Sequence, residues 1–248
     1  MRTHEDHRPV TAATPMTDLG TVLSVWAHPD DEAYLAAGLM MNARAAGHRV
    51  AVVTATRGEH GTPDPDTWPP ERLAPLRERE LATSLAVLDI TEHHWLDHRD
   101  GTLATISDHH GATQIADLID AVRPGLIVTF GPDGMTGHPD HRAISRWVTR
   151  AWHQTGRHPR LWYATVTPEF HSTWHTVNTT AGLWPNPADA PCTPTPDLAH
   201  TVHCAGPTLT RKYEALRAHH SQTAPLITLL GEPTYRSWWS TEYFVAAV

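Results

Sequence analysis

Two short motifs supply the residue types that metal-dependent hydrolysis requires. Residues 28–32 are His-Pro-Asp-Asp-Glu, and residues 138–141 are His-Pro-Asp-His. Side chains three positions apart on a helix share a face, so Asp31 can lie beside the first motif's histidine and His141 beside the second motif's first histidine. Two imidazoles and one carboxylate form a common zinc site that leaves a fourth position for water. The motifs therefore predict a metal centre if the fold brings them together.

Both motifs lie downstream of an apolar run that is typical of a buried strand. Residues 22–26 precede the first motif, and residues 126–130 precede the second. In an open α/β sheet, ligands bind beyond the carboxyl ends of the strands, where the strand order reverses. If these strands are neighbours there, the motifs converge on one crevice. A single His-Pro-Asp sequence would be a turn, and His-Pro also occurs at residues 158–159, but the repeated arrangement favours a site.

The wider pattern alternates short apolar strands with helices. It predicts an α/β, Rossmann-like fold with a mostly parallel sheet, helices on both faces and a less regular C-terminal part. A helix over residues 32–46 ends at Gly47, and Pro75 is expected at the first position of a later helix. One further helix is expected to end at residue 122, and another is expected over residues 208–219. Further strands are expected over residues 50–54, near 94–96 and over 161–166. The proline-rich residues 182–196 predict a surface loop.

The whole chain limits domain number, location and partners. Its 248 residues fit one domain, assigned to residues 20–248, after a polar, disordered tail at residues 1–19. No apolar run approaches the roughly 20 residues that cross a bilayer, and there is no signal-type segment, which predicts a cytoplasmic protein with no membrane partner. A net charge of −8 without a Lys/Arg cluster disfavours nucleic acid. The two cysteines provide no disulfide framework and no C-x-x-C motif.

Around the two motifs, the sequence resembles the LmbE-like (PIG-L) family of zinc-dependent de-N-acetylases. The resemblance rests on residues 27–32, Ala-His-Pro-Asp-Asp-Glu, and on residues 137–141, Gly-His-Pro-Asp-His, and it extends over residues 20–225. It implies a Rossmann-like fold. No nucleotide role follows from that fold, because no G-x-G-x-x-G sequence follows the first strand.

The resemblance implies a role for each residue of the motifs. Three residues match the zinc ligands: His28, Asp31 and His141. Asp30 matches the catalytic base, and His138 matches the residue thought to stabilise the oxyanion or to protonate the leaving amine. Asp140 would orient a histidine by hydrogen bonding. For Asp140 and Glu32, a first-turn carboxylate favoured by the helix dipole is the alternative.

Weaker similarities point to residues that would bind substrate. Glu59 lies in an Arg-Gly-Glu sequence that resembles the family's Gly-Glu loop, where the acid contacts substrate hydroxyls. Arg77 and Glu80 resemble a family Arg-x-x-Glu helix, although a solvated helix face also fits them. Asp100, before a glycine, resembles another substrate contact, with a simple turn as the alternative.

A last similarity lies near the C-terminus. Residues 218–222, Ala-His-His-Ser-Gln, resemble a family sequence Ala-His-x-Ser/Thr-Gln, which favours His219 over His220 in the substrate site. One residue departs from the pattern: Thr136 stands where some sugar deacetylases of the family carry a mobile tyrosine near the reacting carbonyl. The departure leaves the kinship intact and the exact substrate open.

The activity that the resemblance implies is hydrolysis of a linear amide, removing an N-acetyl group from an N-acetylglucosamine-type amino sugar conjugate. Metal-activated water attacks the carbonyl, and Asp30 takes its proton. One Zn²⁺ per chain is expected, with Fe²⁺ or Mn²⁺ as alternatives. The partner is a small N-acetylated sugar or conjugate, and a homo-oligomer is left open.

Two alternatives to this activity stay open. The same site could cleave an amide of a thiol conjugate or of a natural product, which only substrate profiling separates. A zinc-binding protein without turnover is disfavoured, because both Asp30 and His138 are present.

Overall fold

A single seven-stranded sheet forms the centre of the molecule. The computed structural model describes residues 18–184, 186 and 190–248. The strand order is β3-β2-β1-β4-β5-β7-β6; β1 to β5 run parallel, and β7 is antiparallel to both of its neighbours. The strands are β1 Val22–Trp26, β2 Val50–Thr54, β3 Glu92–Trp95, β4 Leu126–Phe130, β5 Arg160–Thr165, β6 His200–His203 and β7 Thr241–Ala246.

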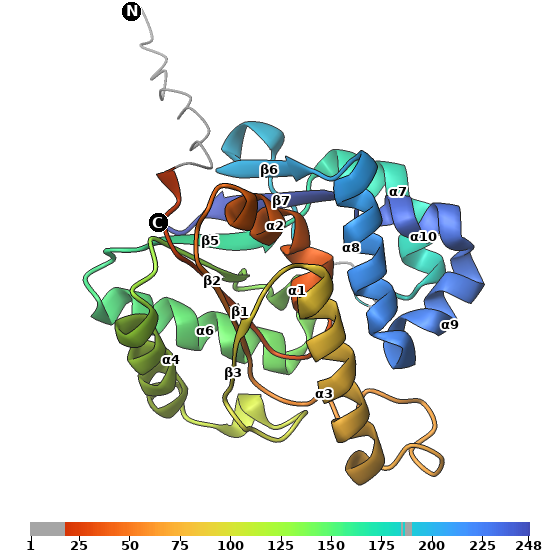
Figure 1. Ribbon diagram of the computed structural model, residues 1–248, viewed down its shortest axis with the longest axis horizontal. Helices are drawn as coiled ribbons and strands as arrows, with labels where there is room; N and C mark the ends of the chain where they lie inside the picture. The colour runs from red at the N-terminus through yellow and green to blue at the C-terminus, as the bar shows by residue number, and fades with distance from the viewer. Residues whose placement is uncertain (1–17, 185, 187–189) are drawn as a thin grey trace, which may run out of the picture.

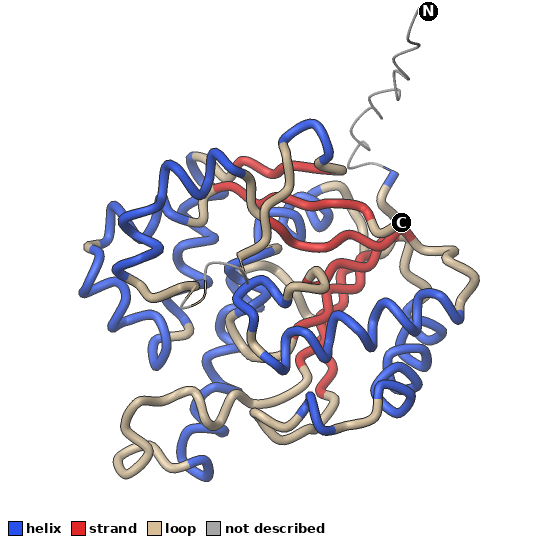
Figure 2. The backbone as a smooth tube through the Cα atoms, turned by 180° about the vertical axis from the view of Figure 1, so that it is seen from behind, coloured by secondary structure: helices blue, strands red, loops and turns tan. Residues whose placement is uncertain are grey.

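Helices surround the sheet in two layers and gather at one end. Helices α4 and α6 pack together, as do α3 and α8 (Figure 1). Helices α7, α9 and α10 lie together at the end of the molecule beyond the strands (Figure 2). The helices are α1 Asp31–Leu35, α2 Ala37–Ala45, α3 Pro70–Val87, α4 Asp108–Val122, α5 Gly134–Gly137, α6 Pro139–Gln154, α7 Pro168–Thr180, α8 Gly206–Ala218, α9 His220–Leu230 and α10 Glu232–Trp238.

The predicted mostly parallel α/β sheet is confirmed. Strands β1, β2 and β4 have the predicted bounds and are buried at every residue, as expected for strands covered on both faces. Two helix predictions are wrong in detail. The helix predicted over residues 32–46 is interrupted at Ala36, whose φ of −144° is not helical. Helix α3 begins at Pro70, and Pro75 lies inside it, because the earlier proline already occupies the first helical turn.

The C-terminal part is more regular than the sequence indicates. The antiparallel β6 and β7 and the helices α7, α9 and α10 carry too weak a pattern to be predicted from sequence alone. Of the predicted tail at residues 1–19, only residues 18 and 19 belong to the described part, and Leu19 is fully buried in the core. The predicted loop at 182–196 also lies partly outside the described residues. None of the described helices is long and apolar enough to cross a membrane.

The order of the strands reverses between β1 and β4. From β1 the chain proceeds outward to β2 and β3, and from β4 it proceeds outward to β5. The two strands pair in parallel from Val22 and Leu126 onward, so their carboxyl ends lie side by side. Because the first motif follows β1 and the second follows β4, the fold brings both motifs to this one edge.

A buried ion pair connects the first motif's helix to the C-terminal strands. Lys212, the single lysine of the chain, is 1% exposed, and its Nζ donates to Glu242 Oε1 at 2.6 Å and to the Tyr34 carbonyl at 2.8 Å. The Glu242 carboxylate also accepts from the backbone N–H groups of Gly38 and Leu39, at the start of α2. This carboxylate thereby satisfies helix N–H groups that have no partner within the helix.

Removing the cation is expected to destabilise the fold severely. Lys212→Met leaves Glu242 buried without a counter-charge, which lowers the free energy of unfolding by about 3–5 kcal/mol. Urea unfolding followed by circular dichroism measures this loss. Arg211→Met, at the exposed neighbouring position on α8, is the matched control and is expected to lose less than about 1 kcal/mol. Equal losses in both variants would contradict a stabilising role for the pair.

Candidate metal centre and active site

Three side chains from the two motifs converge on one point. His28 Nδ1 lies 3.1 Å from His141 Nε2, and the carboxylate of Asp31 lies 3.8 Å from the first nitrogen and 3.5 Å from the second. The edges of a tetrahedron whose corners lie about 2.0–2.2 Å from a central zinc ion are about 3.3–3.6 Å long. The three separations are close to this size, although the 3.8 Å distance is to Asp31 Oδ2 and the 3.5 Å distance is to Asp31 Oδ1. All three side chains are almost completely buried. The three predicted ligands are therefore close enough to bind one ion together.

The outer nitrogen of each imidazole has a hydrogen-bond acceptor beside it. His141 Nδ1 lies 3.0 Å from the Gly134 carbonyl, and His28 Nε2 lies 3.0 Å from Asp100 Oδ1. A proton on each outer nitrogen leaves a lone pair on each inner nitrogen, and these lone pairs face each other across 3.1 Å. Such an arrangement needs a cation or a shared proton between the rings. Histidine ligands of metals characteristically donate their other N–H to a carboxylate or a carbonyl, so the residues present fit a bound metal.

The surroundings shift the pKa values of the three residues apart. Burial and the neighbouring His28 lower the pKa of His141 well below its usual range. Burial alone would lower the pKa of His28, but the carboxylates of Asp100 and Asp140, 3.0 and 3.5 Å from its Nε2, and the charge of Asp31 raise it to about 10. Burial, together with nearby Asp30, raises the pKa of Asp31 to about 7. Without a metal, the site therefore retains a proton on His28 at neutral pH.

Asp30 lies beside the three ligands in an unusual backbone conformation. Its φ of 108° lies in the left-handed region, which a non-glycine residue adopts only when neighbours hold it there. Its N–H donates to Glu32 Oε2 at 3.0 Å, and its carboxylate lies 3.3 Å from the Arg77 guanidinium. Burial raises the pKa of Asp30, and Arg77 opposes this effect.

His138 lies against both histidine ligands. Its ring centroid is 4.9 Å from that of His28 and 5.0 Å from that of His141. His138 Nδ1 accepts a hydrogen bond from the Asp140 N–H at 3.2 Å, which leaves the proton of the neutral ring on Nε2. Burial and the neighbouring His28 lower the pKa of His138, which favours this neutral ring.

Asp140 ties the second motif to the loop after β3. Its carboxylate is fully buried, accepts from the backbone N–H groups of Gly101 and Leu103, and lies 3.5 Å from His28 Nε2. Asp100 Oδ1 faces the same ring nitrogen of His28, and Asp100 Oδ2 accepts from the His60 N–H. Both carboxylates therefore face the outer nitrogen of His28.

Of the residues expected to bind substrate, Glu59 and Asp100 lie next to each other, whereas Arg77 and His219 are buried behind the site. Glu59 Oε1 accepts from the Asp100 N–H, whereas its buried Oε2 has no partner within the described residues. Arg77, only 3% exposed, donates to the carbonyls of Gly58 and Pro29 in addition to Asp30. A side chain at Gly58 would collide with this guanidinium, and the φ of +63° there also requires glycine. Arg77 thus lies behind the site.

His219 is also buried behind the site. It is 0% exposed, and its Nε2 lies 3.0 Å from Glu32 Oε1, while the other oxygen of Glu32 accepts from the Asp30 N–H.

The solvated helix face considered for Arg77 and Glu80 is excluded, because Glu80 is 7% exposed and accepts from both the N–H and the hydroxyl of Ser221.

A cavity of about 260 Å³ opens directly onto the site. Asp30, Asp31 and His141 form its polar wall, and Thr136, whose hydroxyl lies 3.4 Å from His141 Nδ1, adjoins them. The remaining wall is mostly apolar: Tyr34, Leu35, Phe130, Met135, Leu183, Leu226, Trp238 and Trp239, with Gln222. Gln222 and Leu226 belong to α9, and Trp238 belongs to α10, two helices that the sequence pattern did not predict.

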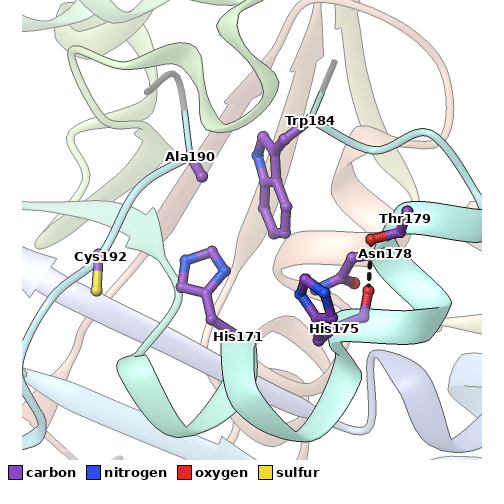
Figure 3. A pocket seen from close by; sticks show the side chains of 7 residues that line it. All are labelled: His171, His175, Asn178, Thr179, Trp184, Ala190 and Cys192. Carbon is purple, nitrogen blue, oxygen red and sulfur yellow. Dashed lines mark hydrogen bonds between the residues drawn. The ribbon is translucent and has the colours of Figure 1, made fainter. Parts of the chain in front are cut away.

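A second cavity, of about 340 Å³, lies away from the three ligands. His171 and His175, one turn apart on α7, line it together with Trp184 and Cys192 (Figure 3). The His171 ring lies 2.7 Å from the Pro191 carbonyl, and Cys192 points away from the histidines in this view. Within the described part of the chain, two groups of three metal-ligating side chains have donor atoms within 4.8 Å of one another: His28, His138 and His141, and His28, Asp100 and Asp140. The α7 cavity therefore has no comparable ligand set.

Comparison with known proteins identifies similar sequences. Residues 23–152 match the family model described as GlcNAc-PI de-N-acetylase, PIG-L. A relative from Saccharomonospora viridis is 32% identical over 91% of this chain and 94% of its own length. Another from Kineococcus radiotolerans is 34% identical over 52% of this chain, and the match spans only 44% of that relative. Both are named 1D-myo-inositol 2-acetamido-2-deoxy-alpha-D-glucopyranoside deacetylase.

Solved structures show the same fold. An N,N'-diacetylchitobiose deacetylase from Pyrococcus horikoshii, in complex with its inhibitor, superimposes with a TM-score of 0.64. The match covers 94% of this chain and 85% of the other at 21% sequence identity. At that identity, the likeness concerns the arrangement of the strands and helices.

Zinc binding is expected to strengthen as the pH rises. The raised pKa of His28, about 10, means that zinc must displace a proton from the site at any lower pH. Each proton displaced makes the affinity rise about tenfold per pH unit between about pH 6.5 and 8.5. Competition with a chromophoric chelator at several pH values measures this slope.

Two variants on α6 control this experiment. His141→Ala removes a ligand and is expected to abolish tight binding, whereas His153→Ala, at an exposed position of the same helix, is expected to retain it. An affinity that does not change with pH, or tight binding by His141→Ala, would contradict the assigned ligand set.

Proposed function

The chain belongs to the PIG-L family of de-N-acetylases, and from this premise we propose that it is a zinc-dependent hydrolase that removes an N-acetyl group from an amino sugar conjugate. The observation that carries the proposal is the grouping of His28, Asp31 and His141 around one point, with Asp30 and His138 beside it. When bound there, zinc would polarise the amide carbonyl and lower the pKa of a coordinated water to about 7.

Asp30 is suited to act as the general base. Its carboxylate lines the cavity, and its raised pKa brings it closer to the pH at which proton transfer to and from a carboxylate is efficient. Arg77 holds the carboxylate, and Glu32, supported by His219, holds the backbone N–H. We therefore assign Arg77 and His219 to the positioning of Asp30, in place of the direct substrate contact expected from the sequence.

His138 is suited to donate a hydrogen bond to the oxyanion. As a neutral ring with its proton on Nε2, it stabilises the charge that develops on the carbonyl oxygen. Asp30, protonated by the attacking water, then delivers that proton to the departing nitrogen. The carbon–nitrogen bond breaks, and acetate and a free amine result.

The substrate class follows from the relatives and from the polar side of the site. Both bacterial relatives are named for an N-acetylated glucosamine joined to inositol. Next to Asp100, the buried Oε2 of Glu59 has no partner among the described residues, and a carboxylate oxygen of this kind could accept from a sugar hydroxyl once exposed to the substrate. We propose a small N-acetylglucosamine-type conjugate.

Removing the base is expected to abolish turnover while metal binding survives. Asp30→Asn retains the shape of the side chain but cannot accept the proton, so kcat for acetate release falls about 10²–10⁴-fold. Asp117→Asn, at an exposed position of α4, is the control and should match the wild type. Metal content by mass spectrometry should be unchanged in both. Near-normal turnover by Asp30→Asn would exclude this residue as the base.

The role of His138 predicts a graded series of variants. His138→Ala removes the oxyanion donor and is expected to lower kcat about 10²–10³-fold. His138→Gln retains an N–H donor and is expected to recover part of this loss with an unchanged KM. If both variants lose the same activity, a hydrogen bond from His138 does not explain its contribution.

A further inference from the structure

The cavity beside the site has more room than an acetyl group needs. Hydrolysis of an acetamide requires space for one methyl group next to the carbonyl. Liquid water occupies about 30 Å³ per molecule, and a methyl group is of similar size. A cavity of about 260 Å³ therefore leaves space for a chain of several carbons.

The two sides of the three ligands differ in chemistry. On the side of the outer nitrogen of His28 lie the polar side chains of His138, Asp100 and Glu59. On the other side, the cavity wall is built from Tyr34, Phe130, Trp238, Trp239 and aliphatic side chains. His138, Asp100 and Glu59 are not among the described residues that line this cavity.

The reaction fixes which part of the substrate enters the cavity. The carbonyl carbon must lie between the ligands His28, Asp31 and His141 and the base Asp30. The nitrogen and the hydroxyl groups of the sugar require the polar side, where side chains capable of hydrogen bonding lie. The acyl substituent then points away from the sugar, into the mostly apolar cavity that Asp30 and His141 also line.

The cavity is walled by well-fixed side chains. Trp238 Nε1 donates to Asn178 Oδ1 at 2.8 Å, and the Tyr34 hydroxyl is hydrogen-bonded to that of Tyr235 at 2.6 Å. The polar atoms of these aromatic residues are thus satisfied outside the cavity, so their rings present apolar surface to it. An apolar chain is the ligand that such a wall stabilises.

We propose that this cavity is an acyl-chain subsite, and that the enzyme hydrolyses N-acyl amino sugars with straight chains of about four to six carbons in preference to the N-acetyl form. The inference rests on the proposed hydrolase function. The chemistry is unchanged: water adds to the carbonyl, the carbon–nitrogen bond breaks, the chain leaves as a fatty carboxylate, and the amine takes the proton from Asp30.

The test compares N-acetyl-, N-butanoyl- and N-hexanoylglucosamine with the zinc-loaded full chain. Free amine is measured, and kcat/KM is determined for each substrate. Burial of each added methylene is expected to raise kcat/KM about fourfold until the chain fills the cavity. The acetyl substrate serves as the internal reference.

Two substitutions on α9 provide a matched pair. Leu226 lines the cavity, whereas Leu229, three residues later, is 57% exposed. Leu226→Trp is expected to lower the ratio of hexanoyl to acetyl kcat/KM at least about tenfold by filling the cavity, and Leu229→Trp should leave that ratio unchanged. Leu226→Ala enlarges the cavity and should shift the preferred chain length upward, which tests the subsite without a bulky side chain.

The possible outcomes separate this inference from the proposed function. Release of amine from all three substrates at equal kcat/KM, or a preference for acetyl, overturns the acyl subsite while the hydrolase function stands. A preference for longer chains that Leu226→Trp and Leu226→Ala leave unchanged also overturns it. No release from any substrate, despite bound zinc, contradicts the proposed function itself.

Discussion

The close approach of two imidazole nitrogens is the constraint on which the site depends. His28 Nδ1 and His141 Nε2 lie 3.1 Å apart, although 113 positions separate them in the sequence. Their facing lone pairs repel unless a cation or a shared proton lies between them. The surrounding structure holds this arrangement through acceptors on the outer nitrogens, Asp100 for one ring and the Gly134 carbonyl for the other. The neighbouring β1 and β4 strands supply the rigid base that fixes both motifs.

A second network holds Asp30, the proposed base, in position. Asp30 adopts its left-handed backbone conformation because Glu32 accepts its N–H and Arg77 contacts its carboxylate. Glu32 is in turn paired with His219, at the end of α8. The same helix α8 carries Lys212, whose ion pair with Glu242 connects α1, α2 and β7. The C-terminal elements therefore contribute to the positions of Asp30 and of the other proposed catalytic residues.

The sequence was sufficient for the centre of the fold but not for its C-terminal end. Apolar runs such as residues 126–130 predict buried strands with accurate bounds, and the two motifs mark the edge where the ligands meet. Edge strand β6 and helices α9 and α10 are short and only partly buried, so their sequences lack a clear hydrophobic periodicity. The cavity wall that includes Trp238 and Leu226 was therefore not predicted. The buried position of His219 depends on tertiary packing that no local pattern encodes. The residue roles and the cytoplasmic location remain predictions, and the oligomeric state stays open.

The most direct test of the account is anomalous diffraction at the zinc edge from crystals of the zinc-loaded protein. One strong peak per chain is expected, about 2.0–2.2 Å from His28 Nδ1, His141 Nε2 and an oxygen of Asp31. A peak on the opposite side of the His28 ring, between Asp100 and Asp140, would show that the wrong ligands were assigned. The absence of any peak from zinc-saturated crystals would contradict the metal centre and, with it, the proposed mechanism.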